Sequence, residues 1–198
     1  ASLRPIAAVL VSTAAIVPIL LSGGRPNVRE SWTAVAALAK FGVVASMVPG
    51  VLAGDAYVTD LGAFLPGATF ALKADALGVL FALLASVLGI VTSSYSVGYM
   101  RGLSEHDQTR YFAAFAASLA TAIGVAFAAN LVTLFVFYEL LTVATYPLVA
   151  HDESEEARAA GRKYLAYTFL GGVAVLTGTV LVFWLAGTTT FAAGGIAG

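Results

Sequence analysis

The chain carries six long runs of apolar residues, each of roughly the length that a helix needs to cross a lipid bilayer. The runs cover residues 6–21, 31–52, 74–93, 111–129, 131–150 and 164–185. They are too continuous for a transmembrane barrel, whose strands alternate apolar and polar residues. We therefore predict an all-α polytopic bundle of six transmembrane helices that forms a single membrane domain over 1–198.

Composition agrees with a membrane protein, because 60% of the residues are hydrophobic and 11% are charged, against about 25% charged in a soluble domain. The net charge is −1, so the chain has no basic excess for binding nucleic acid. It has no cysteine, which excludes disulfides, iron–sulfur ligation and zinc sites made of thiolates. The two histidines, His106 and His151, fall in predicted loops, whereas a haem would need them inside the bundle. We expect no cofactor, no metal site, and no redox or hydrolytic site.

One acid, Glu139, lies near the middle of the run over 131–150. A rise of about 1.5 Å per residue places it about 12 Å from the start of that run, inside the hydrocarbon core. A charged carboxylate there costs at least ~2.5–3.5 kcal/mol, so an intramembrane acid is by default a functional hypothesis. Helical spacing places Thr142 and Tyr146 on its face, where their hydroxyls could bind the acid or hold a water. Two interpretations stay open: an ion-carrying group, or a protonated acid that serves helix packing alone.

Three other charged residues are candidates for the same site. Lys40 lies inside the second run. A lysine there either has a function, extends its side chain so that the ammonium reaches the membrane surface, or pairs with an acid inside the bundle. Lys163, beside the last run, either takes part in ion transfer or lies among the lipid headgroups. Asp75 opens the third run, where the helix dipole favours an acid, and capping is its expected role. His106 and His151 could collect protons at the surface, but a solvated loop position is the expected account of both.

Two of the connecting segments carry their own signals. Residues 55–73 alternate loosely around Pro66-Gly67, which favours a short hairpin on the membrane surface. In the loop over 151–163, the spacing of Asp152 and Glu155 predicts a capping box. We expect this loop to form a short surface helix that leads into the last run.

Small residues dominate the fourth and sixth runs. Because alanine, glycine, serine and threonine let helix backbones approach closely, we expect both of these helices to pack inside the bundle. Asn130 alone separates the fourth run from the fifth, which predicts a tight helical hairpin.

Basic residues fall mostly on one side of the predicted bundle. With six spans, the loops after the first, third and fifth runs lie on the same side of the membrane. That side carries seven lysines and arginines, and the other side carries two. The seven are Arg25, Arg29, Arg101, Arg110, Arg158, Arg162 and Lys163, and the two are Arg4 and Lys73. Loops rich in lysine and arginine stay in the cytoplasm. We therefore expect a multi-pass protein of the cell membrane whose termini both face away from the cytoplasm.

Two passages of the chain resemble a known family. One is YSVGYMRG over 95–102, followed by RYFAAFAASLATAIGVAFAANLVTLFVFYELLTVATYPLVA, and the other is ARAAGRKYLAYTFLGG over 157–172. Together they resemble the antiporter-like proton-conducting subunits. These occur in the membrane arm of respiratory complex I, in membrane-bound hydrogenases and in Mrp-type sodium/proton antiporters. The segment FYELLTVATYPLV resembles the sequences of the Mrp antiporter D subunit and of the hydrogenases more than that of the largest complex I subunit.

The resemblance implies a role for several residues. It makes Glu139 the proton-carrying acid and Lys163 a candidate charge relay, and Asp75 also resembles the family pattern, whereas Lys40 matches no family position. It covers only the N-terminal part of a family member. The family's partner for the acid is a lysine on a broken seventh helix, beyond Gly198. We therefore expect the chain to be incomplete at its C-terminus, or its second half to come from another subunit.

The function that this resemblance implies is ion translocation, of protons and, as a second candidate, of sodium. The chain would act as a membrane subunit of a multisubunit antiporter or respiratory complex. Its expected partners are other membrane subunits and the lipid bilayer, with no nucleic acid. The alternative is a non-conducting subunit that serves as a structural scaffold in such a complex.

Overall fold

The computed structural model describes residues 2–65, 68–192 and 195–196. Six helices within these residues are long and apolar enough to span a membrane, so the predicted polytopic helical bundle is confirmed. They are α1 (Arg4–Leu21), α2 (Pro26–Ala45) with its continuation α3 (Val48–Leu52), α4 (Ala76–Gly102), α5 (Gln108–Ala126), α6 (Leu131–Val149) and α7 (Glu155–Ala186).

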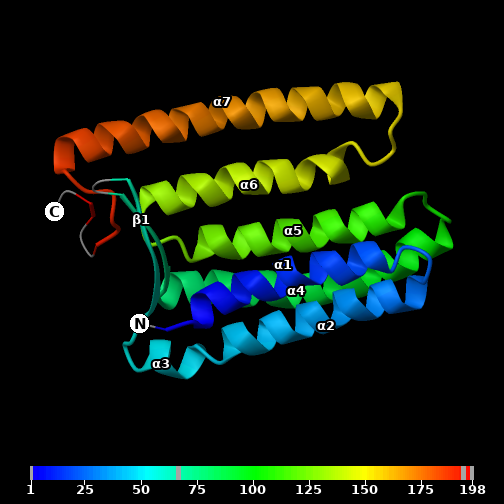
Figure 1. The fold of residues 1–198 in the computed structure, drawn as a ribbon, viewed down its shortest axis with the longest axis horizontal. Helices are drawn as coiled ribbons and strands as arrows, with labels where there is room; N and C mark the ends of the chain where they lie inside the picture. The colour runs from blue at the N-terminus through cyan, green and yellow to red at the C-terminus, as the bar shows by residue number, and fades with distance from the viewer. Residues whose placement is uncertain (1, 66–67, 193–194, 197–198) are drawn as a thin grey trace.

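Consecutive helices run in opposite directions, so the loops α1–α2, α4–α5 and α6–α7 gather at one end of the bundle (Figure 1). Helix α5 lies centrally and packs against α1, α4 and α6. On one side of it, α2 packs against α1 and α4, and on the other, α7 packs against α6. The core consists of two clusters of buried apolar residues, one around Ile123 and Phe127 near one end and one around Ile19 and Phe112 near the other.

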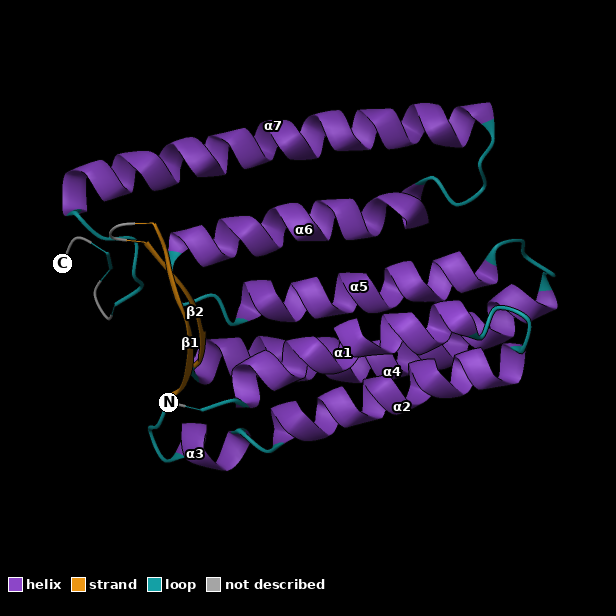
Figure 2. Cartoon of the chain, viewed as in Figure 1, coloured by secondary structure: helices purple, strands orange, loops and turns teal. Residues whose placement is uncertain are grey.

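A two-stranded hairpin lies across the opposite end of the bundle, where the N-terminus also lies (Figure 2). Strand β1 (Tyr57–Leu65) pairs antiparallel with β2 (Ala68–Ala74), and Tyr57 is opposite Ala74. The hairpin predicted over 55–73 is confirmed, while its tip at residues 66–67 lies outside the described residues. We call this end the hairpin end and the other one the basic end.

The free edge of β2 binds the segment between α5 and α6. The backbone N–H of Lys73 donates to the carbonyl of Phe127 at 2.6 Å, and that of Ala129 donates to the carbonyl of Ala71 at 3.1 Å. These bonds explain why α5 ends at Ala126 rather than at the predicted residue 129, because the next residues pair with the strand. The hairpin thus fixes where α6 begins.

Two helices extend beyond the runs predicted from hydropathy. Helix α4 continues to Gly102 rather than ending at 93, and Ser93 and Ser94 donate back to helix carbonyls at 2.6 and 3.0 Å. Serine hydroxyls that donate hydrogen bonds to carbonyls of their own helix can be accommodated inside it, so these residues do not end the helix. Helix α2 begins at Pro26 rather than at 31, because proline is favoured in the first turn.

The start of α7 bears on two predictions. The helix expected within 151–163 forms, and it begins at Glu155 and continues without a break into the last predicted run. The predicted capping box of Asp152 and Glu155 is wrong, because Ser154 is the N-cap and its hydroxyl accepts from the N–H of Ala157 at 3.1 Å. Glu155 and Glu156 lie in the first turn, where their charge suits the helix dipole.

The packing of the small-residue helices agrees with prediction for α5 and not for α7. The predicted hairpin of α5 with α6 is confirmed, and the ring of Phe137 on α6 lies over Gly124, where a side chain would collide with it. Helix α7 lies at the edge of the bundle, and its residues Leu170, Val173 and Trp184 are exposed. Its small residues serve one close contact with α6 rather than burial on every side.

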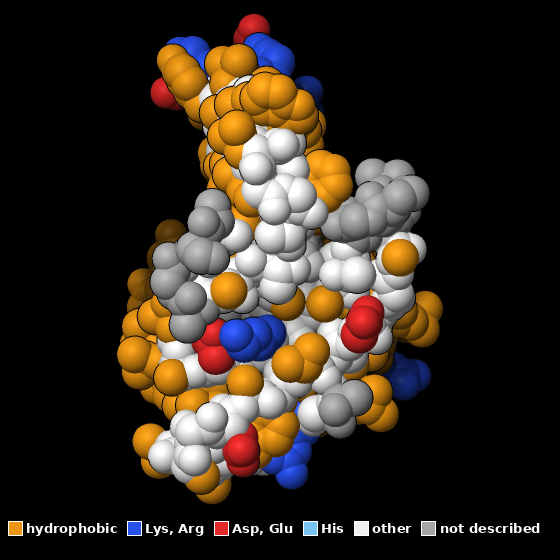
Figure 3. Space-filling view, turned by 90° about the vertical axis from the view of Figure 1, so that its left-hand side faces the viewer, with side chains coloured by type: hydrophobic (Ala, Val, Ile, Leu, Met, Phe, Trp, Pro, Cys, Tyr) orange, Lys and Arg blue, Asp and Glu red, His pale blue; other side chains and the backbone are white. Residues whose placement is uncertain are grey.

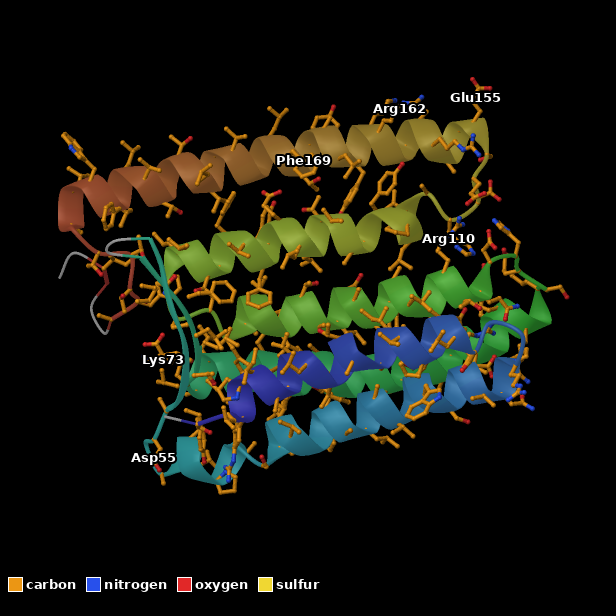
Figure 4. The ribbon with its side chains drawn as sticks, viewed as in Figure 1. Asp55, Lys73, Arg110, Glu155, Arg162 and Phe169 are labelled. Carbon is orange, nitrogen blue, oxygen red and sulfur yellow. The ribbon has the colours of Figure 1, made fainter. Side chains whose placement is uncertain are left out.

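The distribution of surface side chains fits a membrane-spanning protein. A view onto the hairpin end shows apolar side chains along the flanks, with charged ones sparse, and a narrow upper part at the height of α7 (Figure 3). Asp55 and Lys73 lie at the hairpin end, whereas Arg110, Glu155 and Arg162 lie toward the basic end (Figure 4). The chain is therefore a multi-pass membrane protein, with charge concentrated toward the two ends of the bundle.

Candidate ion-translocation site

Helix α6 carries the central acid, and its first turn is anchored by side chains. Asn130 is the N-cap, and its Oδ1 accepts from the backbone N–H of Thr133 at 2.8 Å. Its Nδ2 donates to the carbonyl of Thr69, also at 2.8 Å, while the hydroxyl of Thr133 accepts from the N–H of Ala71 at 3.1 Å. Both side chains are buried, so the asparagine before the acid-bearing helix joins α6 to the hairpin and fixes its position.

Glu139 points from α6 toward α7. Its carboxylate occupies the space beside Gly172, where a Cβ atom would collide with it. The side chain is half-buried, and among the described residues no cation lies within salt-bridge distance of it. The acid is thus held between two helices, about 12 Å along α6, by the absence of a side chain at position 172.

Thr142 and Tyr146, the predicted hydroxyl partners of Glu139, make other contacts within the described residues. Thr142 is buried and donates to the carbonyl of Tyr138 in its own helix at 3.3 Å. The ring of Tyr146 packs on Gly161 of α7, 2.9 Å from the position of a Cβ there. The link that crosses the interface joins Thr145 to Tyr164, whose hydroxyl oxygens are 2.5 Å apart. Sequence reasoning missed this pair, although Thr145 adjoins Tyr146 and Tyr164 begins the last predicted run.

A cavity of about 340 Å³ opens at the basic end of the same two helices. Its lining comprises Arg110, Tyr146, Pro147, Ala150, Glu153 and Arg158. Tyr146 lies one helical turn from Thr142 and two turns from Glu139, so polar groups extend from this cavity into the membrane along α6. We call the contact of α6 with α7 from Glu139 to this cavity the α6–α7 interface.

Lys163 and Asp75 lie away from Glu139. Lys163 is exposed on α7 and precedes Gly172 by nine residues, about 13 Å along the helix axis. Asp75 caps α4, as expected, and its Oδ1 accepts from the N–H of Gly78 at 3.0 Å. It also lies 3.9 Å from the Nζ of Lys73.

Lys40 is enclosed in the interior of the bundle. Its side chain is 0% exposed, and within the described part of the chain its Nζ has no hydrogen-bond partner. It therefore neither snorkels to the surface nor pairs with a described acid, the two structural roles that the sequence left open. The central helix α5 separates α6, which carries Glu139, from the helices around Lys40.

The basic end is held by a buried ion cluster that the sequence did not predict. Both carboxylate oxygens of Glu30 accept from the Arg101 guanidinium, at 2.9 and 2.6 Å. Arg29 is 3.3 Å from Glu30, donates to Gln108 at 2.7 Å and lies over the ring of Phe112. The cluster ties the α1–α2 connection to the α4–α5 connection. The loops after the first and third predicted runs therefore lie at the same end of the bundle, as predicted.

The two histidines also meet at the basic end. The rings of His106 and His151 stack with centroids 5.0 Å apart, and the ligand atoms of Glu105, His106 and His151 lie within 4.8 Å of one another. These three residues could hold a metal ion, which the sequence did not predict. Burial lowers the pKa of His151 below its ordinary value, and the Arg110 guanidinium and His106 lower it further.

Two family models match the chain in the regions that form this site. Residues 128–194, which contain α6 and α7, match the model of the NADH:quinone oxidoreductase/Mrp antiporter transmembrane region. Residues 66–112 match the model of the N-terminus of complex I NADH-ubiquinone oxidoreductase chain 5.

Known proteins extend this similarity to most of the chain. The chain is 32% identical over 189 residues, 88% of its length, to NADH-quinone oxidoreductase subunit L of Mycobacterium tuberculosis, and covers 29% of that protein. It is 32% identical over 160 residues, 77% of its length, to a probable K(+)/H(+) antiporter subunit of the A/B type from Rhizobium meliloti, and covers 15% of it. These two relatives are of the L and A/B types, so they do not place the chain nearer to the D type.

A solved structure shows the same fold. The Mrp complex from Dietzia sp. DQ12-45-1b aligns with 94% of this chain at a TM-score of 0.76 and 22% identity, over 20% of the matched chain. Across these comparisons the chain spans less than a third of the proteins that it matches.

Proposed function

We propose, since the chain belongs to the family of antiporter-like membrane subunits found in complex I and Mrp-type antiporters, that it translocates ions as one membrane subunit of a larger complex. The proton is the proposed ion, and sodium is the second candidate. The observation that carries the proposal is Glu139, an acid inside a membrane helix, facing a glycine of the next helix and unpaired among the described residues.

The proposed role of Glu139 is to alternate between a protonated and an ionised state. An apolar environment is unfavourable for an unpaired charge, and a cation at close range offsets that cost. The cation is proposed to come from a partner subunit, because Lys163 lies about 13 Å away along α7. Lys163 is then an accessory group that relays charge nearer the membrane surface.

The α6–α7 interface offers a route by which protons could reach Glu139. The cavity between Arg110 and Arg158 opens toward the basic end, and Tyr146 lies in its lining. The hydroxyl pair of Thr145 and Tyr164 crosses the interface between this cavity and the acid. Hydroxyls can both donate and accept, so they can pass a proton on with the help of water.

The orientation that we propose places the basic end in the cytoplasm of the cell, with both termini on the opposite side. Loops rich in arginine and lysine are retained in the cytoplasm, and the seven cations of the three loops outnumber the two at the hairpin end. Moving one charge against the membrane potential requires about 2.3 kcal/mol per 100 mV. Partner subunits or an opposing ion gradient are proposed to supply this energy.

Substitution of Glu139 tests the proposal. Glu139→Gln keeps the size and hydrogen-bonding capacity of the side chain but cannot release a proton, so ion transport by the assembled complex should be lost or strongly reduced. Glu139→Asp should retain part of it. Glu155→Gln is the matched control, because Glu155 is exposed in the first turn of α7. A complex with this variant should transport ions like the wild type.

Assembly separates the transport role from the scaffold alternative. A conducting subunit with Glu139→Gln should still co-purify with its partner subunits, whereas a scaffold that needs this acid for packing should lose them. Wild-type transport by an assembled Glu139→Gln complex would leave Glu139 with a packing role alone. For the orientation, an impermeant thiol reagent added outside intact cells should not label Ser154→Cys, the single cysteine that the variant would contain.

A further inference from the structure

Lys40 occupies an interior position at which an ordinary core side chain would be apolar. It is fully enclosed, and its Nζ lies against α4, 3.4 Å from the position that a Cβ on Gly89 would take. Glycine at position 89 therefore leaves the space into which the lysine head fits. An unpartnered ammonium in an apolar interior is so unfavourable that it must either recruit water or give up its proton.

No charged residue of the described helices packed around Lys40 lies at its depth. Helix α2 packs against α1, α4 and α5. The charged residues of these four helices lie near the helix ends: Arg4 on α1, Arg29 and Glu30 on α2, Asp75 and Arg101 on α4, and Arg110 on α5. Glu30 precedes Lys40 by ten residues, about 15 Å along α2, and already binds Arg101. No acid on these helices is placed to neutralise the lysine.

Buried polar groups line the contact of α2 with α4. We call them the α2–α4 seam: Thr33 and Lys40 on α2, and Ser86, Gly89, Ser93 and Ser96 on α4. Ser93 and Ser96 follow Gly89 toward the Glu30 end of the bundle, whereas Ser86 precedes it toward the hairpin end. The four hydroxyl side chains are all buried, and the Oγ of Ser86 has no partner among the described residues. Hydroxyls with unused bonding capacity beside an unpaired amine are the surroundings that a buried water needs.

A small cavity lies along the seam. It has a volume of about 10 Å³, about the space needed by one water, and Ser12, Thr33 and Ser93 contribute polar groups to its lining. Leu119 also lines it, and the same side chain lies 3.2 Å from the position of a Cβ on Gly89, next to the lysine head. The side chain of Leu119 therefore lies both at this cavity and beside the lysine head.

We propose that Lys40 is a second proton-exchanging site of this chain, reached from the Glu30 end through the α2–α4 seam. In the exchange step the ammonium releases a proton to a water of the seam and becomes a neutral amine, and the reverse step loads it again. The site rests on the proposed ion-translocating function but uses a route separate from Glu139, because α5 lies between the two.

Water access to position 40 is the first test. The chain has no cysteine, and Lys40→Cys therefore gives residues 1–198 one thiol, which is compared with the wild-type complex treated in the same way. The probe is aminoethyl methanethiolsulfonate, added to one face of membrane vesicles with an impermeant thiol scavenger on the other. Because thiolates react and form only where water reaches, labelling from the Glu30 end should be at least about tenfold faster than from the hairpin end. Leu88→Cys, on the outward face of α4, is the control and should react slowly from both ends.

Restoring the charge is the second test. The reagent leaves an aminoethyl disulfide on the cysteine, which is close to lysine in length and charge. Lys40→Cys should transport several-fold more slowly than the wild type, and the aminoethyl reagent should recover much of the loss. The neutral reagent methyl methanethiolsulfonate should react without recovery. Equal recovery by both reagents would mean that position 40 only needs to be filled.

A third variant keeps the proposal testable if Lys40→Cys does not assemble. Ser93→Cys retains Lys40 and should be labelled from the Glu30 end, with a slower rate when Thr33→Val removes a hydroxyl from the lining of the same cavity. Labelling of neither cysteine, or faster labelling from the hairpin end, would overturn the proposal. These labelling rates do not depend on transport, so they would persist even if Glu139→Gln showed that the main proposal is wrong.

Discussion

Replacing Gly172 by alanine tests how α7 holds the central acid. A Cβ at this position would overlap the carboxylate of Glu139, so the carboxylate has to move away from α7. The atom that must move is the end of a flexible side chain, and the backbone of α6 can stay in place. We expect the fold to survive while the position of the acid changes.

The magnitude follows from two opposing contributions. Alanine is better than glycine in a helix by about 1 kcal/mol. Overpacking costs about 1–3 kcal/mol, and the flexible carboxylate places Gly172→Ala toward the lower part of that range. The net free energy of unfolding should therefore change by no more than about 1 kcal/mol.

Two other glycines give matched controls. Gly178 lies on the same helix with no atom within 4 Å of its would-be Cβ, so Gly178→Ala should be neutral or stabilising by up to about 1 kcal/mol. Gly124→Ala would drive a methyl group into the ring of Phe137, so its cost lies toward the upper part of the overpacking range and the net loss should be about 1–2 kcal/mol.

The assay combines thermal unfolding in detergent with ion transport in reconstituted vesicles. Stability should fall in the order Gly178→Ala, Gly172→Ala, Gly124→Ala. Transport by Gly172→Ala should fall further than its stability does, and its pH dependence should differ from that of Gly178→Ala. If Gly172→Ala and Gly178→Ala match in both stability and transport, Glu139 is not held by the glycine, and the reasoning fails.

Two further predictions concern the basic end. Lys163→Ala should reduce transport less than Glu139→Gln, and Lys163→Arg less still, because Lys163 is exposed and about 13 Å from the acid along α7; equal losses in Lys163→Arg and Glu139→Gln would show a direct role. Burial and the neighbouring Arg110 lower the pKa of His151, so its contribution to stability is complete above about pH 6.5 and is lost as pH falls through the lowered pKa. The midpoint temperature of thermal unfolding should therefore decrease as the pH is lowered below 6.5, and His151→Gln should make this decrease smaller. An equal pH dependence of the midpoint in His151→Gln and the wild type would contradict this role of His151.

The helices were predictable because each is an apolar run with few interruptions, and the hairpin was predictable from alternation around a Pro-Gly pair. The boundaries were not, because hydropathy does not register polar residues that continue a helix. Ser93 and Ser94 donate to carbonyls of their own helix, and Glu155 and Glu156 begin α7 in the aqueous region. Hydrogen bonding and solvation decide these ends.

The position of a helix in the bundle was only partly predictable. Small residues mark a close approach between backbones, but they do not say how many neighbours approach. Helix α5 is surrounded, whereas on α7 the glycines 161 and 172 each face one residue of α6. The site followed the same pattern: the depth of Glu139 came from the sequence, while its contact with Gly172 required the tertiary structure.

The two intramembrane ionisable residues define different problems for charge transfer. Glu139 lies between α6 and α7 at the edge of the described bundle, where a further helix can approach it. Lys40 is enclosed by helices whose described charges lie near their ends, so no approaching side chain can neutralise it without displacing one of them. A cation can therefore control Glu139 by docking, whereas only water and protons can control Lys40. If both residues exchange protons, blocking the α2–α4 seam should leave the state of Glu139 unchanged, and infrared difference spectra at the carboxylic C=O stretch can measure this. A shift of the Glu139 band on seam blockage would show that the two sites are coupled through α5.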